Sequence, residues 1–180
     1  MNPQNKKINT EWKIAQNSIA KLLNNNSFEV WEERRIKNKR IDILAKRTVG
    51  DTIYYLIFEV KHYNKVTAGT EDKFLEQLNK YLELLIKREL ERKKFNYVLK
   101  KIIFIAYLVL SNDYGIYKNR RKNWRKERLF PDNRELEEIW KRNVYLFSST
   151  QKYIQKNLES VGLPFYSQTQ ISDFFSEEKQ

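Results

Sequence analysis

The 180-residue chain has no cysteine and only one histidine, His62. The absence of cysteine excludes disulfide bonds, cysteine-ligated zinc, iron–sulfur clusters and thiol nucleophiles. With a single histidine and no G-x-S-x-G sequence, a Ser-His-Asp hydrolase is hard to assemble, and no G-x-x-x-x-G-K-[ST] loop is present for nucleotide hydrolysis. Four glycines, three prolines and 41% hydrophobic residues favour a folded α/β domain over a disordered chain. Few classes of enzyme therefore remain.

Long hydrophobic runs and a balancing negative charge are also missing. The longest apolar run, residues 102–110, has the length of a strand rather than of a membrane span, and the first residues lack the apolar segment of a secretory signal. We therefore expect an intracellular, cytoplasmic protein with no membrane partner. Lys and Arg number 35 against 23 Asp and Glu, giving a net charge of +12 that favours a polyanionic partner.

Three charged residues lie inside apolar, strand-like sequence. Residues 40–45 and 52–61 are rich in β-branched and aromatic side chains and are separated by a turn sequence, which predicts a β-hairpin. Asp42 lies in the first arm, and Glu59 and Lys61 lie at the end of the second, where alternation puts them on one face. Because a buried carboxylate is costly without a cation or hydrogen bonds, this placement indicates a site.

The chemistry of these residues suits a divalent cation. Carboxylate oxygens of Asp42 and Glu59, with the main-chain carbonyl of Val60, make a hard oxygen site for Mg²⁺, or for Mn²⁺ in its place. The ammonium of Lys61 can position an attacking water, help to deprotonate it, or stabilise charge on a phosphate. Alternation turns His62 away from this face. The alternative interpretation is a surface ion pair, since an Asp followed later by Glu-x-Lys is common.

A helical period follows the hairpin over residues 70–93. Gln77 and Tyr81 are four residues apart, so they are neighbours on the helix surface, and both border its apolar stripe. The Gln77 amide can therefore reach the strand ends and hydrogen-bond a metal ligand, a water or a phosphate.

With these residues in place, the chain resembles the PD-(D/E)XK nucleases, which have the restriction-endonuclease-like fold. Asp42 matches the first acid, Glu59 to Lys61 match the E-x-K element, and residues 77–81 are similar to the Q-x-x-x-Y motif of the RecB-type branch. Ile41 stands where the family name has proline. The resemblance covers residues 10–110 approximately and implies that the two acids bind metal, that the lysine is catalytic, and that Gln77 and Tyr81 are accessory catalytic residues.

The same resemblance implies an αβββαβ core, with a central mixed sheet flanked by helices. The sequence pattern predicts that order, with a helix at 10–23, a strand at 28–36, the hairpin, the helix at 70–93 and a strand at 97–110. C-terminal additions are predicted as a helix at 134–142, a strand at 144–147 and a helix at 151–161. We expect a single nuclease domain, residues 1–180, whose core is followed by a basic loop and these elements in 111–180.

Members of this family often carry a glutamate on the first helix that contacts the metal site, and Glu11 is the candidate here. The alternative is an ordinary glutamate in the first helical turn, where the helix dipole favours it.

Two basic segments are candidates for DNA contact. Cationic side chains hold phosphates without reading sequence, and an exposed tryptophan can stack on an unpaired base. The candidates are Lys37, Lys39 and Arg40 before the first acid, and Arg120, Arg121, Trp124 and Arg125 in the basic run at 118–126. The alternatives are a solvated basic turn and a solvated loop whose tryptophan packs inward.

Together these features lead us to expect a Mg²⁺-dependent DNA nuclease that hydrolyses phosphodiester bonds. Two alternatives stay open: a Holliday-junction resolvase of the same fold, and a non-catalytic nucleic-acid-binding protein. The resemblance does not decide between endonuclease and exonuclease, or between a monomer and a homodimer.

Overall fold

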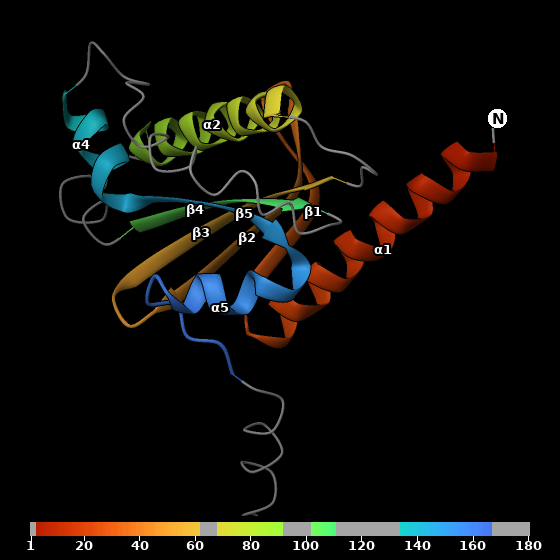
Figure 1. Ribbon diagram of the computed structural model, residues 1–180. Helices are drawn as coiled ribbons and strands as arrows, with labels where there is room; N and C mark the ends of the chain where they lie inside the picture. The colour runs from red at the N-terminus through yellow and green to blue at the C-terminus, as the bar shows by residue number, and fades with distance from the viewer. Residues whose placement is uncertain (1–2, 62–67, 92–101, 111–133, 167–180) are drawn as a thin grey trace, which may run out of the picture.

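The structure, a computed structural model, describes residues 3–61, 68–91, 102–110 and 134–166 (Figure 1). Its elements follow the chain in this order: α1 (Pro3–Asn25), β1 (Glu29–Ile36), β2 (Lys39–Val49), β3 (Thr52–Lys61), α2 (Ala68–Glu91), β4 (Ile102–Leu110), α4 (Arg134–Asn143), β5 (Val144–Thr150), the 3-10 turn η4 (Gln151–Tyr153) and α5 (Ile154–Glu159). The basic run at 118–126, with Arg120, Arg121, Trp124 and Arg125, lies outside the described residues.

The five strands form one mixed sheet in which spatial order follows chain order. β1, β2 and β3 form an antiparallel meander, whereas β4 pairs in parallel with β3, and β5 in parallel with β4. A parallel neighbour requires a crossover connection, and α2 lies between β3 and β4 along the chain. The protein is therefore an α/β protein with a mixed sheet, as the sequence predicts.

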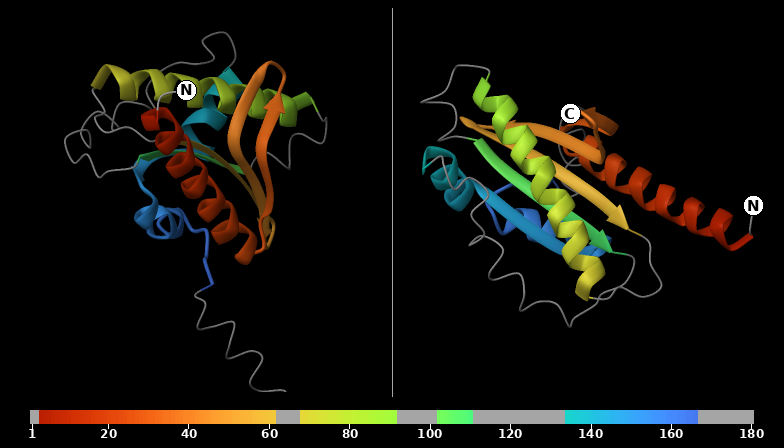
Figure 2. Two further views of the ribbon diagram at one scale, coloured as in Figure 1. Left: turned by 90° about the vertical axis from the view of Figure 1, so that its right-hand side faces the viewer. Right: turned by 90° about the horizontal axis from the view of Figure 1, so that it is seen from above.

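Helices cover both faces of the sheet. Figure 1 shows α2 on one face and α1 with α5 on the other, and the views in Figure 2 agree. On the α2 face, Leu78 and Leu82 are fully buried against Ile57 and other strand residues. On the opposite face, Ile19 of α1 packs in a cluster with Phe58. Complete burial of one such side chain contributes about 1.5–3 kcal/mol, so the sheet is fixed between two apolar layers.

β3 and β4 are the central strands and are buried on both faces. Residues 54–60 and 104–110 are all buried, which explains why neither segment shows the alternation of a half-exposed strand. Any polar side chain in these segments, such as that of Glu59, lies in the interior.

Element boundaries differ from the predicted ones in several places, among them α1, β2 and the last helix. α1 begins at Pro3 rather than at residue 10, because its first residues lack an apolar stripe and so give no periodic signal. β2 continues past residue 45 to Val49. Arg47 can be buried within this strand because its guanidinium donates hydrogen bonds to the main-chain carbonyls of Asn26 and Pro164. The last predicted helix is the shorter α5, and it stops before Gly162, whose φ of 80° belongs to the left-handed region.

None of the helices in the described ranges is both long and apolar enough to cross a membrane.

Candidate functional site

The hairpin arms β2 and β3 separate at Asp42. Their pairing runs from Val49 and Thr52 to Ile43 and Phe58, while β3 continues beside β4 as far as Lys61. One further step in the same register would place Asp42 opposite Glu59. Instead of a ladder bond, the main-chain N–H of Val60 donates to Oδ2 of Asp42 at 2.8 Å. The carboxylate thus takes the place of a strand partner where the sheet opens.

Asp42, Glu59 and Lys61 lie on the face of the sheet that α2 covers. The two acids are 6% and 2% exposed. Oε1 of Glu59 is ion-paired with the ammonium of Lys61. That ammonium also lies 5.0 Å from the centre of the Phe74 ring of α2, a distance at which cation and ring attract. The structure therefore brings together the two acids and the lysine that hairpin pairing predicts to be neighbours.

Electrostatics show that the two acids interact. Burial and, next, the charge of Asp42 raise the pKa of Glu59 to about 7, while Lys61 and the Gln77 hydrogen bond act in the opposite direction. Burial also raises the pKa of Asp42, against the hydrogen bond from Val60 and the charge of Lys61. Two carboxylates with one lysine in a dry environment leave a deficit of positive charge, which a divalent cation would remove.

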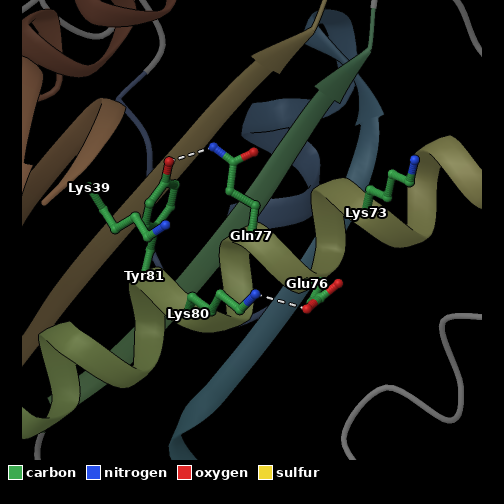
Figure 3. Close-up of a pocket in the computed structure, with 6 residues that line it drawn as sticks. All are labelled: Lys39, Lys73, Glu76, Gln77, Lys80 and Tyr81. Carbon is green, nitrogen blue, oxygen red and sulfur yellow. Dashed lines mark hydrogen bonds and ion pairs between the residues drawn. The ribbon is translucent and has the colours of Figure 1, made fainter.

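Two side chains of α2 connect this helix to the site. Nε2 of Gln77 donates to Oε1 of Glu59 at 2.9 Å and to the hydroxyl of Tyr81, a bond that Figure 3 shows. The Tyr81 hydroxyl in turn donates to the main-chain carbonyl of Arg40 at 2.7 Å, and burial raises the pKa of this phenol, which keeps it a neutral donor. One chain of hydrogen bonds therefore runs from Glu59 through α2 to the start of β2.

One oxygen in the site lacks a partner. Oε2 of Glu59 is buried and accepts no hydrogen bond from any described residue. An unsatisfied buried carboxylate oxygen costs free energy, so its presence beside Asp42 fits a bound cation. The residues that could hold such an ion are Asp42, Glu59 and the main-chain carbonyl of Val60, all oxygen donors of the kind that Mg²⁺ and Mn²⁺ accept.

Glu11 does not complete a three-acid site. Within the described ranges there is no group of three or more histidine, cysteine, aspartate or glutamate side chains that could hold a metal ion. Glu11 is half-buried on α1, the helix that covers the opposite face of the sheet. The alternative interpretation, an ordinary glutamate in the first helical turn, is wrong, because α1 begins at Pro3.

Sequence reasoning missed Gln16, which is fully buried on α1. Its Nε2 donates to the main-chain carbonyl of Asp42 at 3.2 Å and to Oε2 of Glu32 at 3.0 Å. Asp42 and Glu33 form the one step missing from the β1–β2 register, and Glu33 has a φ of 50°. Gln16 therefore satisfies a carbonyl that the strand ladder leaves out. The available signal was a polar residue within the apolar stripe of the first helix, four residues after Trp12.

The described basic candidates lie at the turn before Asp42. Lys37, Lys39 and Arg40 are all exposed, and the guanidinium of Arg40 lies 3.7 Å from a carboxylate oxygen of Glu33. Lys39 also lines a pocket of about 190 Å³ next to Gln77. The turn thus presents cationic side chains close to the buried acids.

The chain matches no protein-family model, no curated protein and no solved structure.

What the site can do chemically follows from its own residues. It offers two adjacent buried carboxylates, a lysine in contact with one of them, and cationic side chains at its edge. This set can hold a divalent cation and a polyanion at one place.

Proposed function

We propose that the protein is a metal-dependent nuclease that hydrolyses phosphodiester bonds in DNA, with a site of the PD-(D/E)XK kind. The observation that carries the proposal is the meeting of Asp42 and Glu59, both buried, where β2 and β3 separate, with one oxygen of Glu59 lacking any partner among the described residues. Lys61 lies at the same place through its ion pair with Glu59.

Asp42, Glu59 and the Val60 carbonyl would hold the cation. Mg²⁺ is commonly held by one or two carboxylates together with waters and substrate phosphates, so a third acid such as Glu11 is not required. A divalent cation bound there supplies positive charge to the phosphodiester and lowers the pKa of water.

Lys61 acts on the nucleophile or on the phosphate. Its ammonium is held between Glu59 and the Phe74 ring, with 20% of the side chain exposed, so it is positioned but still accessible. In this position it donates hydrogen bonds to the attacking water or to the phosphate oxygen on which charge builds up.

Gln77 and Tyr81 position the acids rather than react. Gln77 fixes Glu59, and Tyr81 fixes the carbonyl of Arg40, two residues before Asp42. Because the two side chains are themselves hydrogen-bonded, they set the separation between the two acids.

The architecture supports the proposed family. A helix, three antiparallel strands, a second helix and a strand parallel to the third match the order of an αβββαβ restriction-endonuclease-like core. On this proposal α4, β5 and α5 are C-terminal additions. The net charge of +12 and the cationic turn next to Asp42 support DNA as the substrate.

The test is a cleavage assay on supercoiled, linear, single-stranded and four-way-junction DNA, with Mg²⁺, Mn²⁺ or chelator. Lys61→Met is compared with Lys46→Met, a matched control because Lys46 in the neighbouring strand also lies over an aromatic ring, Tyr55, at 5.9 Å. We expect cleavage only with metal. The cleavage rate should fall by at least about 100-fold in Lys61→Met and in Asp42→Ala, and the Lys46→Met control should cleave as fast as the native chain.

Each alternative has its own outcome in this assay. Cleavage that is unchanged in Lys61→Met and Asp42→Ala would overturn the proposed site. DNA binding without cleavage under any metal would favour a non-catalytic binding protein. Selective cleavage of the junction by a symmetric homodimer would identify a resolvase.

A further inference from the structure

A small pocket lies between the start of β2 and the helix α2, next to the acids. It measures about 190 Å³ and is lined by Lys39 from β2 and by Lys73, Glu76, Gln77, Lys80 and Tyr81 from α2 (Figure 3). Gln77 and Tyr81 are the same side chains that bond Glu59 and the Arg40 carbonyl. Gln77 and Tyr81 therefore lie between the pocket and the acid site and contribute to both.

The pocket has an excess of positive charge. Three of its lining residues are lysines and one is a glutamate. Lys80 and Glu76 pair at 2.8 Å, as Figure 3 shows, but both are more than half exposed, so their pairing is weak and easily exchanged. Lys39 and Lys73 form no ion pair with any residue in the described ranges. Two lysines without an ion pair in the described ranges thus border the pocket, Lys39 at the end beside Tyr81 and Lys73 at the other end, where its exposed side chain points outward.

The two lysines belong to different elements that meet at Gln77 and Tyr81. Lys73 is four residues before Gln77, hence on the same side of α2, and Lys39 lies beside Tyr81 in Figure 3. An oxyanion between them would be bound by ammonium groups from two different elements once the exposed, flexible side chain of Lys73 turns toward Gln77. Phosphate, with charge spread over several oxygens, matches such a set of donors, whereas a neutral ligand would leave the ammonium groups without a counter-charge.

We propose that this pocket binds a second phosphate group of the nucleic acid, a neighbour of the one that is cleaved, through Lys39 and Lys73. The inference rests on the proposed nuclease function and extends it. Tyr81 joins β2, which carries Lys39, to α2, which carries Lys73 and Gln77, through its hydrogen bond to the Arg40 carbonyl. A phosphate held there would fix the distance along the strand to the scissile phosphate.

Two kinds of phosphate share this chemistry. An internal phosphodiester would make the pocket a clamp on a continuous strand. A terminal phosphate monoester would make the enzyme count from a strand end. Both are oxyanions for the same two lysines, so the experiment must separate them.

The experiment measures binding without metal, so that cleavage does not enter. Fluorescence anisotropy in chelator is recorded over a range of salt concentrations for single strands that carry a 5′-phosphate or a 5′-hydroxyl, and for strands with one neutral methylphosphonate at each internal position. The native chain is compared with Lys39→Ala/Lys73→Ala. The control is Lys21→Ala/Lys87→Ala, which removes the same charge from exposed positions on α1 and α2 outside the pocket.

We expect the salt dependence of log Kd to flatten by about 0.7 for each phosphate that the pocket variant no longer binds, and to stay unchanged in the control. One neutral position should weaken binding of the native chain and leave binding of the pocket variant unaffected. Weaker binding at one internal position identifies the diester, and weaker binding of the 5′-hydroxyl strand identifies the monoester. Unchanged melting temperatures check that all variants are folded.

The pocket and the nuclease proposal fail separately. If the pocket variant binds every strand as the control does, at every salt concentration, the phosphate pocket is overturned even if the native chain cleaves DNA. If the pocket variant loses binding as expected but the native chain cleaves nothing with any metal, the phosphate pocket remains and the nuclease proposal falls.

Discussion

The main-chain N–H of Val60 donates a 2.8 Å hydrogen bond to the carboxylate of Asp42, across the point where β2 and β3 stop pairing. This bond lowers the pKa of Asp42 but does not offset the effect of burial, which raises it. It also joins one proposed metal ligand to the strand that carries the other. The position of the Asp42 side chain and the path of β3 at Val60 are therefore linked. A substitution of Asp42 should also affect the end of β3.

Replacing Asp42 by two different residues separates its structural and its metal-binding roles. Asp42→Asn keeps an acceptor for the Val60 N–H and removes a buried charge, so the free energy of unfolding should not fall. Asp42→Ala leaves that N–H without a partner and should cost about 1–3 kcal/mol. Both variants should lose the stabilisation that Mg²⁺ gives the native chain, measured by urea unfolding with and without the ion. An Asn variant that Mg²⁺ still stabilises as it does the native chain would show that Asp42 is not a ligand.

The pKa of Glu59 predicts how stability depends on pH without metal. Its folded value of about 7 exceeds the ordinary value of 4.5, so the folded protein keeps a proton that the unfolded chain releases between these pH values. The contribution is fully present below about pH 4.5 and is lost as pH rises to about 7, by up to about 3 kcal/mol. Glu59→Gln should therefore raise the free energy of unfolding at pH 8 and change it little at pH 4.

Glu33→Gln is the control for this prediction. Glu33 is exposed, and its hydrogen bond with Lys13 lowers its pKa, so this substitution should not stabilise the protein at pH 8. The measurement is urea unfolding at several pH values in chelator. Equal pH profiles for native and Glu59→Gln would contradict a buried, proton-holding Glu59.

Tyr81→Phe removes the hydroxyl that joins α2 to the start of β2. The Arg40 carbonyl loses its donor and Gln77 loses an acceptor, so we expect a loss of about 1 kcal/mol in unfolding free energy. Cleavage should fall more steeply than stability, because the separation of the two acids is no longer fixed. Tyr153→Phe is the control, since the Tyr153 hydroxyl makes no hydrogen bond within the described ranges. The link is disproved if both variants unfold and cleave alike.

Gln16→Leu tests whether the helix on the opposite face supports Asp42. The substitution keeps a side chain of similar size but leaves the Asp42 carbonyl without its donor, at a cost of about 1–3 kcal/mol. Gln155→Leu removes an exposed hydrogen bond to Glu159 and should stay within about 0.5 kcal/mol of native. Urea unfolding measures both, and Mg²⁺ titration of the two proteins shows whether the metal site depends on Gln16.

Much of the core could be predicted from sequence because its signals are local. The apolar runs of β3 and β4 and the helical period of α2 give their type directly, and strand alternation puts Glu59 and Lys61 on one face. Their closeness to Asp42, which needs only hairpin pairing, is confirmed. The metal, the DNA substrate and the catalytic roles stay predictions.

The features that sequence did not predict depend on partners far along the chain. Gln16 meets the carbonyl of Asp42 26 residues later, and Arg47 meets that of Pro164 117 residues later. A buried arginine in a strand and a buried glutamine in a helix both look like interruptions of an apolar pattern. Only the fold shows that each has a carbonyl to satisfy.

The parting of β2 from β3 has a consequence for spectroscopy. Beyond Phe58, β3 has no further pairing partner in β2, and the amide of Val60 is shielded from deuterium exchange by a carboxylate instead of a carbonyl. The exchange rate of this single amide proton should therefore follow the ionisation of Asp42. It reports protonation of the buried carboxylate without an added label.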